Sequence, residues 1–355
     1  STDIKNLPGR TGLLEQISLI LNTCIDCPKC VAECAFLKKY GTPKHIAGTC
    51  DPTDSRWVSV AFECSLCGLC ASVCPVGVNP EDMFLEMRRE AVEQGTAPFS
   101  EHKTMMAYEK RGTSKRYSWY SLPENCDTVL FPGCTLTGTR PDTTIDLYEH
   151  LKKKNPCLGI VLDCCCKPSH DLGRQEFFNE MLSEMKSYLV DHGIKTIITA
   201  CPNCYKVFNH YGNPLKVTSV YETLAECGIP EIASSIKMPA ISIHDPCVLR
   251  KETSIHDAVR QLADVRGFNI LEMPHSRENT LCCGEGGSVG FVSAKFSAKW
   301  GDIRNNETNT HRLLTYCAGC AGSLNKVVPT DHILDSIFDP EALLTGKFKA
   351  AKAPA

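Results

Sequence analysis

Cysteines in two runs of the same spacing constrain this chain more than any other feature of its sequence. The stretch "CIDCPKCVAEC" carries the first run and "CSLCGLCASVCP" the second, and both follow the pattern CxxCxxCxxxC. In this pattern three closely spaced thiolates hold three irons of one 4Fe–4S cubane, and the fourth thiolate binds the neighbouring cluster. We therefore expect one cubane on Cys24, Cys27, Cys30 and Cys74, and a second cubane on Cys64, Cys67, Cys70 and Cys34.

The number of cysteines also bears on the compartment. The chain has 23 cysteines in 355 residues, and it opens without a charged-then-apolar signal segment. No apolar run approaches the roughly 18 residues of a membrane span. This observation is compatible with peripheral attachment of the chain to a membrane through a partner protein. We expect a cytoplasmic protein with reduced thiols, because cysteines there usually serve metals or redox catalysis. A disulfide scaffold is disfavoured because such scaffolds are short and secreted. Zinc sites are disfavoured because both runs have the same four-cysteine spacing that is typical of paired cubanes.

Helices are expected around the two cysteine runs. The interval 35–63 is long enough for an additional helix, and the pattern of 83–95 predicts a helix that leaves the second run. Residues 1–100 resemble the helical two-cluster ferredoxin domains that carry electrons within larger redox enzymes. One departure is Ala35, which stands where the second run has Pro75.

Residues 101–126 lose hydrophobic periodicity and are expected to form a linker. The stretch "EKRGTSKRYSWYSLPEN" mixes basic and aromatic side chains, a pattern that can stack nucleic-acid bases. The net charge of the chain is −3, however, and a strap that packs its aromatic residues on neighbouring domains is the better interpretation. We therefore expect no nucleic-acid partner.

After the linker, the chain repeats a unit of its own. "TVLFPGCTL" matches "ISIHDPCVL", "VLDCCCKPSHDLG" matches "NTLCCGEGGSVG", and "TIITACPNCYKVF" matches "RLLTYCAGCAGSL". The matched cysteines are 113 to 118 residues apart, which indicates a duplicated domain. We assign the first copy to residues 127–240, the second copy to residues 241–340, and a mobile tail to residues 341–355.

Both copies are expected to be α/β domains with a parallel sheet. Apolar runs such as 158–163 and 194–200 end at cysteines, and helical patterns such as 175–193 follow them. Ligands of parallel sheets bind outside the carboxyl ends of the strands, which is where these cysteines fall. The chain is therefore predicted to be α+β overall, with a helical two-cluster domain followed by two duplicated α/β domains.

Each copy supplies five thiols at matching positions. The first thiol set is Cys134, Cys164, Cys165, Cys201 and Cys204, and the second thiol set is Cys247, Cys282, Cys283, Cys317 and Cys320. Neighbouring residues of an extended chain point to opposite sides, so a vicinal pair chelates one metal poorly. A kinked pair could instead bridge two irons of a larger, irregular cluster. The CxxC pairs are expected to open helices, whose amide groups stabilise negative sulfur.

The spacing within each set resembles the cysteine-rich CCG signature of the heterodisulfide reductase catalytic subunit and its relatives. The domain order is similar to the fused, single-chain form of that reductase, and to iron–sulfur subunits of anaerobic glycerol-3-phosphate dehydrogenase, glycolate and lactate oxidases, and thiol:fumarate reductase. The resemblance implies that each thiol set holds a noncubane 4Fe–4S cluster, and that a disulfide is split between two such clusters. In the first copy Cys166 replaces the glycine of the signature, so one or two noncubane clusters are expected.

Three further sequence features are a glycine-rich stretch, two histidines and four isolated cysteines. The glycines of "GEGGSVG" let the backbone approach a cluster and do not form a dinucleotide loop, so we expect no flavin in this chain. His170 and His244 lie near set cysteines and could either supply protons or bond to loop backbone. The cysteines outside both runs and both sets are expected to be buried as small apolar residues; these are Cys50, Cys126, Cys157 and Cys227.

These features lead to one functional hypothesis and one alternative. The hypothesis is an iron–sulfur oxidoreductase subunit that carries electrons through two cubanes to the CCG domains, where a disulfide is reduced or thiols are oxidised. The alternative is a relay that links a partner dehydrogenase to a quinone or another carrier. Expected partners are a flavoprotein, hydrogenase, dehydrogenase or ferredoxin, together with a small disulfide, thiol or quinone substrate. A structural or zinc-storage protein is strongly disfavoured.

Overall fold

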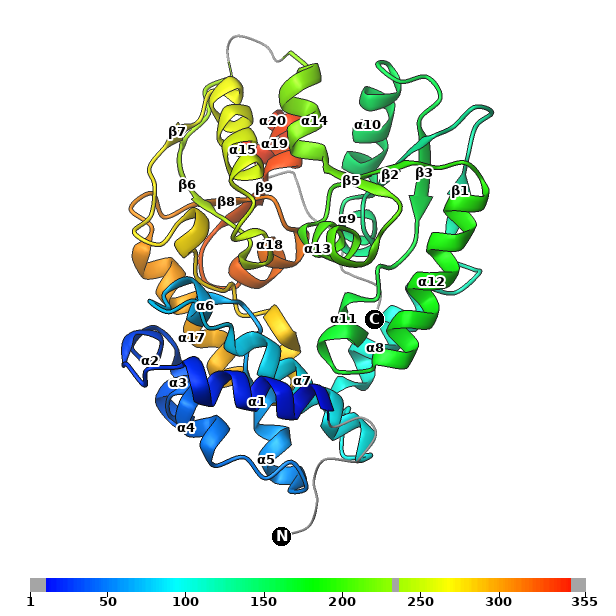
Figure 1. The fold of residues 1–355 in the computed structure, drawn as a ribbon. Helices are drawn as coiled ribbons and strands as arrows, with labels where there is room; N and C mark the ends of the chain where they lie inside the picture. The colour runs from blue at the N-terminus through cyan, green and yellow to red at the C-terminus, as the bar shows by residue number, and fades with distance from the viewer. Residues whose placement is uncertain (1–10, 232–235, 346–355) are drawn as a thin grey trace. The chain divides into compact units, whose positions relative to one another are not determined.

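The computed structural model describes residues 11–231 and 236–345 (Figure 1). Its chain divides into two compact units, which are taken here one at a time. The helical unit consists of the described parts of residues 1–106, 168–178 and 284–300. The two-sheet unit consists of the described parts of residues 107–167, 179–283 and 301–355. The segments that follow Lys167 and Cys283 therefore belong to the helical unit.

Short helices arranged around α1 and α7 build the helical unit. Its α-helices are α1 (Thr11–Thr23), α2 (Lys29–Glu33), α3 (Ala35–Tyr40), α4 (Pro43–Gly48), α5 (Ser55–Ser59), α6 (Leu69–Ser72), α7 (Pro80–Glu93), α11 (Lys167–Asp171) and α16 (Val289–Val292). Its 3₁₀ helices are η2 (Val60–Glu63), η3 (Ser100–His102) and η6 (Gly286–Ser288). The longer helices α8 (Lys103–Gly112), α12 (Gln175–Asp191) and α17 (Ala294–Glu307) run from the residue range of one unit into that of the other.

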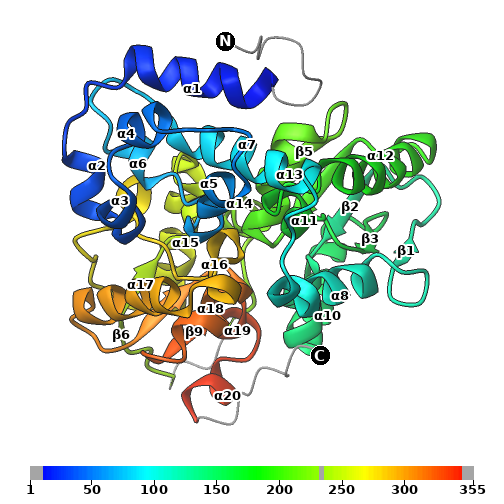
Figure 2. The ribbon, with the colours of Figure 1, turned by 90° about the horizontal axis from the view of Figure 1, so that it is seen from below.

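The core of the helical unit lies between α1 and α7, and α1 also runs alongside α4 (Figure 2). Leu13 and Ile20 of α1 are buried with Met83, Phe84 and Met87 of α7. Leu13 and Ile20 have the i, i+7 spacing and Met83 and Met87 the i, i+4 spacing, which give each helix one apolar face. Helix α7 begins with a proline at its first position, where the missing N–H costs nothing. It confirms the helix predicted after the second cysteine run.

Two parallel sheets form the framework of the two-sheet unit. The strands of the first copy are β2 (Thr128–Phe131), β3 (Gly159–Leu162), β4 (Thr196–Thr199) and β5 (Lys216–Ser219), and those of the second are β6 (Ala240–His244), β7 (Asn269–Ile270), β8 (Leu313–Thr315) and β9 (Thr330–His332). A further strand, β1 (Trp119–Ser121), precedes the first copy. Among the described residues the sheet orders are β1-β3-β2-β4-β5 and β7-β6-β8-β9, with every pairing parallel except β1 to β3. The equivalent orders confirm two duplicated α/β domains after a helical region.

Helices and 3₁₀ helices cover these sheets. They are α9 (Cys134–Thr139), α10 (Pro141–Lys152), α13 (Pro202–Tyr211), α14 (Val220–Cys227), α15 (Thr253–Arg266), α18 (Ala318–Leu324), α19 (Ile333–Phe338), α20 (Pro340–Leu344), η4 (Cys247–Leu249) and η5 (Arg277–Asn279). By order along the chain, α10 corresponds to α15 and α14 corresponds to α19. Between the two copies, α10 packs on α19 and α14 packs on α15. Each of these contacts thus joins the same pair of equivalent helices, with the roles of the two copies exchanged.

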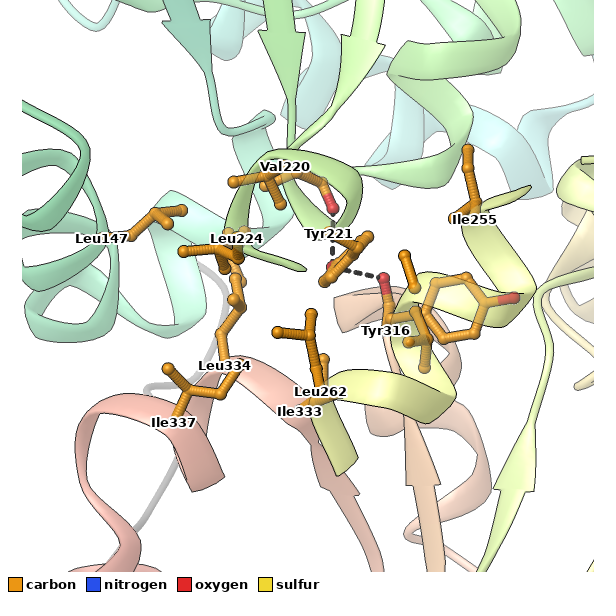
Figure 3. Packing of buried hydrophobic residues seen from close by; sticks show 14 of the residues in the cluster. Leu147, Val220, Tyr221, Leu224, Ile255, Leu262, Tyr316, Ile333, Leu334 and Ile337 are labelled. Carbon is orange, nitrogen blue, oxygen red and sulfur yellow. Dashed lines mark hydrogen bonds between the residues drawn. The ribbon is translucent and has the colours of Figure 1, made fainter. Parts of the chain in front are cut away.

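One apolar core joins the two copies (Figure 3). Leu224 of α14 lies in it beside Leu262 of α15, and Leu147 of α10 contributes together with Leu334 and Ile337 of α19. All of these side chains are at most 2% exposed. Burying such a side chain contributes roughly 1.5–3 kcal/mol, so the copies form a single folded body within this unit.

The segment predicted as a linker, 101–126, contains the whole of α8 and the strand β1 (Trp119–Ser121). Strand β1 adds to the edge of the first sheet by antiparallel pairing with β3. The predicted mobile tail, 341–355, begins inside α20, and its residues from 346 onward lie outside the described part of the chain.

Candidate metal centres

The cysteines of the two amino-terminal runs line two cavities of the described helical unit. One small cavity is bordered by Cys24, Cys27, Cys30, Cys70 and Cys74. A second small cavity is bordered by Cys34, Cys64, Cys67 and Cys70. Each cavity thus has three cysteines of one run together with the fourth cysteine of the other run. The grouping has the crossed form that the sequence predicts, while the ligand assignment itself stays a prediction.

Local backbone geometry turns these cysteines inward. Gly68 adopts a left-handed conformation (φ +69°) directly before α6, which carries Cys70. The backbone N–H of Leu66 donates to Cys64 Sγ at 3.4 Å, and that of Val78 donates to Cys74 Sγ at 3.3 Å. Hydrogen bonds to cluster sulfurs are one means by which a protein sets a cluster's reduction potential.

The thiols of each cavity are costly to ionise without a cation. Burial, with the Cys24 and Cys27 thiols, raises the pKa of Cys30 to about 11. Burial and the Cys67 thiol likewise raise the pKa of Cys34 to about 11. Because an iron–sulfur cluster supplies positive charge to its thiolate ligands, this donor set fits a metal cluster better than free thiolates.

Arg88 of α7 holds the backbone around Cys64, and no sequence pattern pointed to this role. Its side chain is fully buried and donates to the carbonyl oxygens of Cys64 (2.7 Å) and Ala61 (3.1 and 3.2 Å). It also donates to the carbonyl oxygens of Asp171 (2.7 Å) and Gly287 (2.8 Å). Arg88 thereby connects the three chain segments of the helical unit.

The first thiol set gathers at the carboxyl ends of the strands of the first sheet. Cys134 opens α9 after β2, the vicinal cysteines follow β3, and Cys201 caps α13 after β4. The sulfurs of Cys134 and Cys164 are 3.9 Å apart. Gly133 lies so close to Cys201 that a Cβ atom on Gly133 would be 2.6 Å from the Cys201 Cβ, which leaves no room for a side chain. The strand–loop–helix order therefore places the set where the sequence predicts it.

The N-terminus of α13 favours thiolate at Cys201. A hydrogen bond from the Cys204 thiol, helped by the backbone N–H groups of Asn203 and Cys204, lowers the pKa of Cys201 to about 7. Burial opposes this shift. The CxxC pairs open α13 and α18 as predicted, and unsatisfied N–H groups at helix N-termini stabilise negative sulfur.

The first copy contains two further donors beside its set. Cys166 is buried and takes a left-handed backbone (φ +55°), as does Gly284 at the equivalent place in the second copy (φ +96°). Its sulfur, that of Cys164 and a carboxylate oxygen of Glu109 lie within 4.8 Å of one another. Glu109 comes from α8 and is buried, and it matches none of the motifs in the sequence.

The second thiol set has the same arrangement in the second copy. Cys247 opens η4 after β6, and Cys317 caps α18 after β8 with its sulfur 3.4 Å from the Cys320 nitrogen. Contacts with the Cys283 and Cys317 thiols, ahead of burial, raise the pKa of Cys320. A contact with the Cys282 thiol, ahead of burial, does the same for the pKa of Cys247. The structure therefore brings the five thiols of each set together at one end of each sheet.

The two histidines singled out in the sequence have different environments. His170 Nδ1 lies 2.9 Å from a carboxylate oxygen of Asp171, a local partner. His244 is fully buried, and neither ring nitrogen has a hydrogen-bond partner among the described residues. Its ring and the sulfurs of Cys283 and Cys320 have donor atoms within 4.8 Å of one another. Burial, with Arg304 nearby, lowers the pKa of His244 to about 3, so the imidazole is neutral near pH 7.

An ionic network fixes the loop next to His244. Asp245 accepts both Nη1 and Nη2 of Arg260 at 2.9 Å and the Tyr316 hydroxyl at 2.9 Å. Burial opposes ionisation, but the hydrogen bonds and charge of Arg260 lower the pKa of Asp245 to about 2. Since Tyr316 precedes Cys317 and Asp245 lies two residues before Cys247, the network ties together two loops of the second set.

The prediction for the remaining cysteines is partly wrong. Cys126 is buried as expected, Cys50 and Cys227 are half-buried, and Cys157 is exposed. Cys157 follows the helix α10 in a turn before β3, where its side chain has no place in the core.

None of the described helices combines the length with the apolar character that crossing a bilayer requires.

Comparison with known protein families agrees with this division. The model of the 4Fe–4S dicluster domain matches residues 20–78. The model of the CCG cysteine-rich domain matches twice, at residues 128–209 and 241–325. The dicluster domain implies two cubane clusters, and the cysteine groups of the CCG domains indicate further clusters.

Several known proteins are similar along most of this chain. One subunit of the fumarate reductase (CoM/CoB) of Methanothermobacter marburgensis is 25% identical over 84% of this chain and 66% of its own length. One subunit of the dihydromethanophenazine:CoB–CoM heterodisulfide reductase of Methanosarcina barkeri is 24% identical over 96% of both chains. The EtfAB:quinone oxidoreductase of Syntrophomonas wolfei is 24% identical over 71% of this chain and 40% of its own length. The chain is thus a distant homologue of this heterodisulfide reductase subunit and of related iron–sulfur oxidoreductases, with one 4Fe–4S dicluster domain and two CCG domains.

Proposed function

We propose that this chain receives electrons one at a time on its dicluster domain and uses them to reduce a disulfide at its CCG domains. The observation that carries the proposal is the pair of complete five-thiol sets, each gathered at the carboxyl ends of a parallel sheet. A relay between two carriers needs only four thiolates per cubane, whereas both copies keep five. The vicinal pairs supply the additional thiol, as expected of noncubane 4Fe–4S clusters.

In this proposal the thiols of the two sets hold clusters, and the surrounding chain stabilises their charge. When bound, the clusters supply one-electron steps that together reduce one disulfide bond. The balanced reaction takes R–S–S–R′, two electrons and two protons to RSH and R′SH, and runs backwards for thiol oxidation. The helix N-termini at Cys201 and Cys317 stabilise negative charge on the sets. Cys164 and Cys282 are buried, so a cluster held by them would be shielded from water.

A partner protein supplies the electrons in this proposal, since the motifs of the sequence point to iron–sulfur clusters and not to a flavin or nicotinamide. A flavoprotein, hydrogenase, dehydrogenase or ferredoxin meets this need. The direction of flow follows from the partner's potential relative to that of the disulfide.

The alternative function is a relay to a quinone. It is supported by the similarity to the EtfAB:quinone oxidoreductase, whose name includes a quinone. In this alternative the dicluster domain carries electrons as before, but the chain does not react with disulfides.

A comparison of two cysteine substitutions tests the proposal. Cys283→Ser removes a buried thiol of the second set, while Cys157→Ser removes an exposed thiol that belongs to neither set. Serine oxygen is a poor ligand for these clusters, so Cys283→Ser should abolish dithionite-driven reduction of small disulfides. Cys157→Ser should retain it. Equal disulfide reductase activity in both variants contradicts the proposal, and quinone reduction without any disulfide reduction in the wild type favours the relay.

A further inference from the structure

The buried imidazole of His244 has no hydrogen-bond partner within the described residues. A buried polar group without a partner destabilises the fold, so each such group calls for an explanation such as an ion. Its ring belongs to a group with the sulfurs of Cys283 and Cys320, all within 4.8 Å. A neutral imidazole and two thiolates together form a donor set that suits iron or zinc.

The first copy lacks this nitrogen. In the first sheet Phe131 pairs with Thr199, two residues before Cys201. In the second sheet His244 pairs with Thr315, two residues before Cys317. The strand registers therefore place Phe131 and His244 at equivalent positions, independently of any sequence matching. Phe131 is fully buried with its ring against Phe208, at 5.1 Å between centroids.

We infer that a ring nitrogen of His244 is a ligand to the metal of the second thiol set, and that the first set has no such ligand. The inference rests on the proposed function, because it requires a metal cluster at the second set. The described contacts of His244 support it: the backbone carbonyl of His244 accepts the Thr315 hydroxyl at 2.9 Å, whereas neither ring nitrogen has a hydrogen-bond partner among the described residues. The adjacent Asp245 is held by Arg260 and Tyr316, which fixes the strand end that carries the imidazole.

This difference makes the two CCG sites electronically unequal. Nitrogen ligands raise the reduction potential of an iron–sulfur cluster relative to thiolates alone, as do nearby positive charges. The second site has His244 and the fully buried guanidinium of Arg304, which acts electrostatically on both His244 and Cys283. The first site has instead the Glu109 carboxylate and the additional thiol of Cys166. The second site is therefore the one that takes electrons more readily.

Pulsed EPR on protein labelled with ¹⁵N only in histidine tests the inference. The reduced protein should show a ¹⁵N hyperfine coupling of the size found for nitrogen bound directly to iron. Absence of any such coupling, or a weak coupling typical of a hydrogen-bonded N–H···S contact, would overturn the inference. Iron analysis of the wild type and of Cys283→Ser separates this outcome from failure of the proposed function, because a loss of iron in the variant shows that the second set contains iron.

Exchange of the two equivalent residues assigns the signal. His244→Phe introduces the residue that the first copy already accommodates, and it should abolish the coupling and lower the potential of the cluster at the second set. Phe131→His is the reciprocal variant and should add a coupling at the first set. A coupling that persists in His244→Phe, with iron content unchanged, refutes the assignment. If His244→Phe fails to fold, the wild-type spectrum and the spectrum of Phe131→His still decide whether a histidine nitrogen binds the metal.

Discussion

Tyr221 donates a hydrogen bond from its hydroxyl to the carbonyl oxygen of Tyr316 at 2.8 Å (Figure 3). The carbonyl oxygen of Ala200 lies 2.9 Å from the same hydroxyl, so the two oxygens share its single proton. Ala200 precedes Cys201 and Tyr316 precedes Cys317, so one side chain connects the strand ends that lead into both CxxC pairs. Tyr221 is buried in the core that joins the copies, with its ring 5.4 Å from that of Tyr316.

Tyr221→Phe should destabilise the two-sheet unit. The substitution keeps the ring but leaves two buried carbonyl oxygens with one fewer donor, which costs about 1–3 kcal/mol. Tyr148→Phe is the matched control, because Tyr148 is half-buried and donates to a single carbonyl oxygen, that of Leu158, at 2.9 Å. Anaerobic thermal unfolding should give a larger drop in midpoint for Tyr221→Phe. Equal drops would show that the connection between the strand ends adds nothing to stability.

Arg88→Met should destabilise the helical unit and loosen the cluster that includes Cys64. The substitution leaves the carbonyl oxygens of Ala61, Cys64, Asp171 and Gly287 without this donor, which should cost about 3 kcal/mol or more. The control Arg56→Met removes an arginine whose side chain is 90% exposed, so it should change stability little. Denaturation midpoints and iron release to a chelator measure the difference. Similar iron release from both variants would argue against a role of Arg88 at the metal site.

Crossed ligation predicts an unusual pattern of spectral loss. Cys74→Ser should damage the cluster made mainly by Cys24, Cys27 and Cys30, because Cys74 lines their cavity. Cys34→Ser should damage the cluster of the second run, whose cavity Cys34 borders. EPR and resonance Raman spectra of the two variants distinguish the clusters. If each substitution damages the cluster of its own run, the ligation is not crossed.

The metal content follows from the four donor sets. Anaerobically purified protein should contain about sixteen irons per chain if every set holds a four-iron cluster. Iron and sulfide analysis with Mössbauer spectroscopy checks the number and the cluster types. About eight irons would restrict the clusters to the dicluster domain, and stoichiometric zinc with little iron would reject iron–sulfur clusters at these sites.

The sequence predicts the parts of these sites that depend on local spacing. The CxxCxxCxxxC runs and the strand–cysteine–helix order are short-range patterns, so the thiol groups and the parallel sheets could be expected from the sequence alone. The duplication is visible in matched strings of residues, and the equivalent sheet orders agree with it.

The rest depends on contacts between residues far apart in the chain. Arg88 bonds to the Gly287 carbonyl, 199 residues away, and carbonyl oxygens leave no mark in a sequence. Glu109 lies in a segment interpreted as a strap, and only the fold brings its carboxylate to Cys164. His244 stands out in the sequence, and the matched strings already align it with Phe131, an equivalence with which the strand registers agree. Its lack of hydrogen-bond partners among the described residues, however, is visible only in the fold.

The most direct test of disulfide reduction by this chain is the reoxidation of chemically reduced cubanes by a disulfide, followed by stopped-flow absorption. Protein reduced with a slight excess of dithionite is mixed anaerobically with a small disulfide, in the wild type and in Cys282→Ser. Cys282 is buried in the second set, and the dicluster domain keeps its own cysteines in the variant. We predict that the cubanes of the wild type reoxidise as free thiol appears, and that those of Cys282→Ser become reduced but stay reduced. Cubanes of both proteins that reoxidise at the same rate, or wild-type cubanes that never reoxidise with any disulfide, would contradict disulfide reduction at the CCG domains.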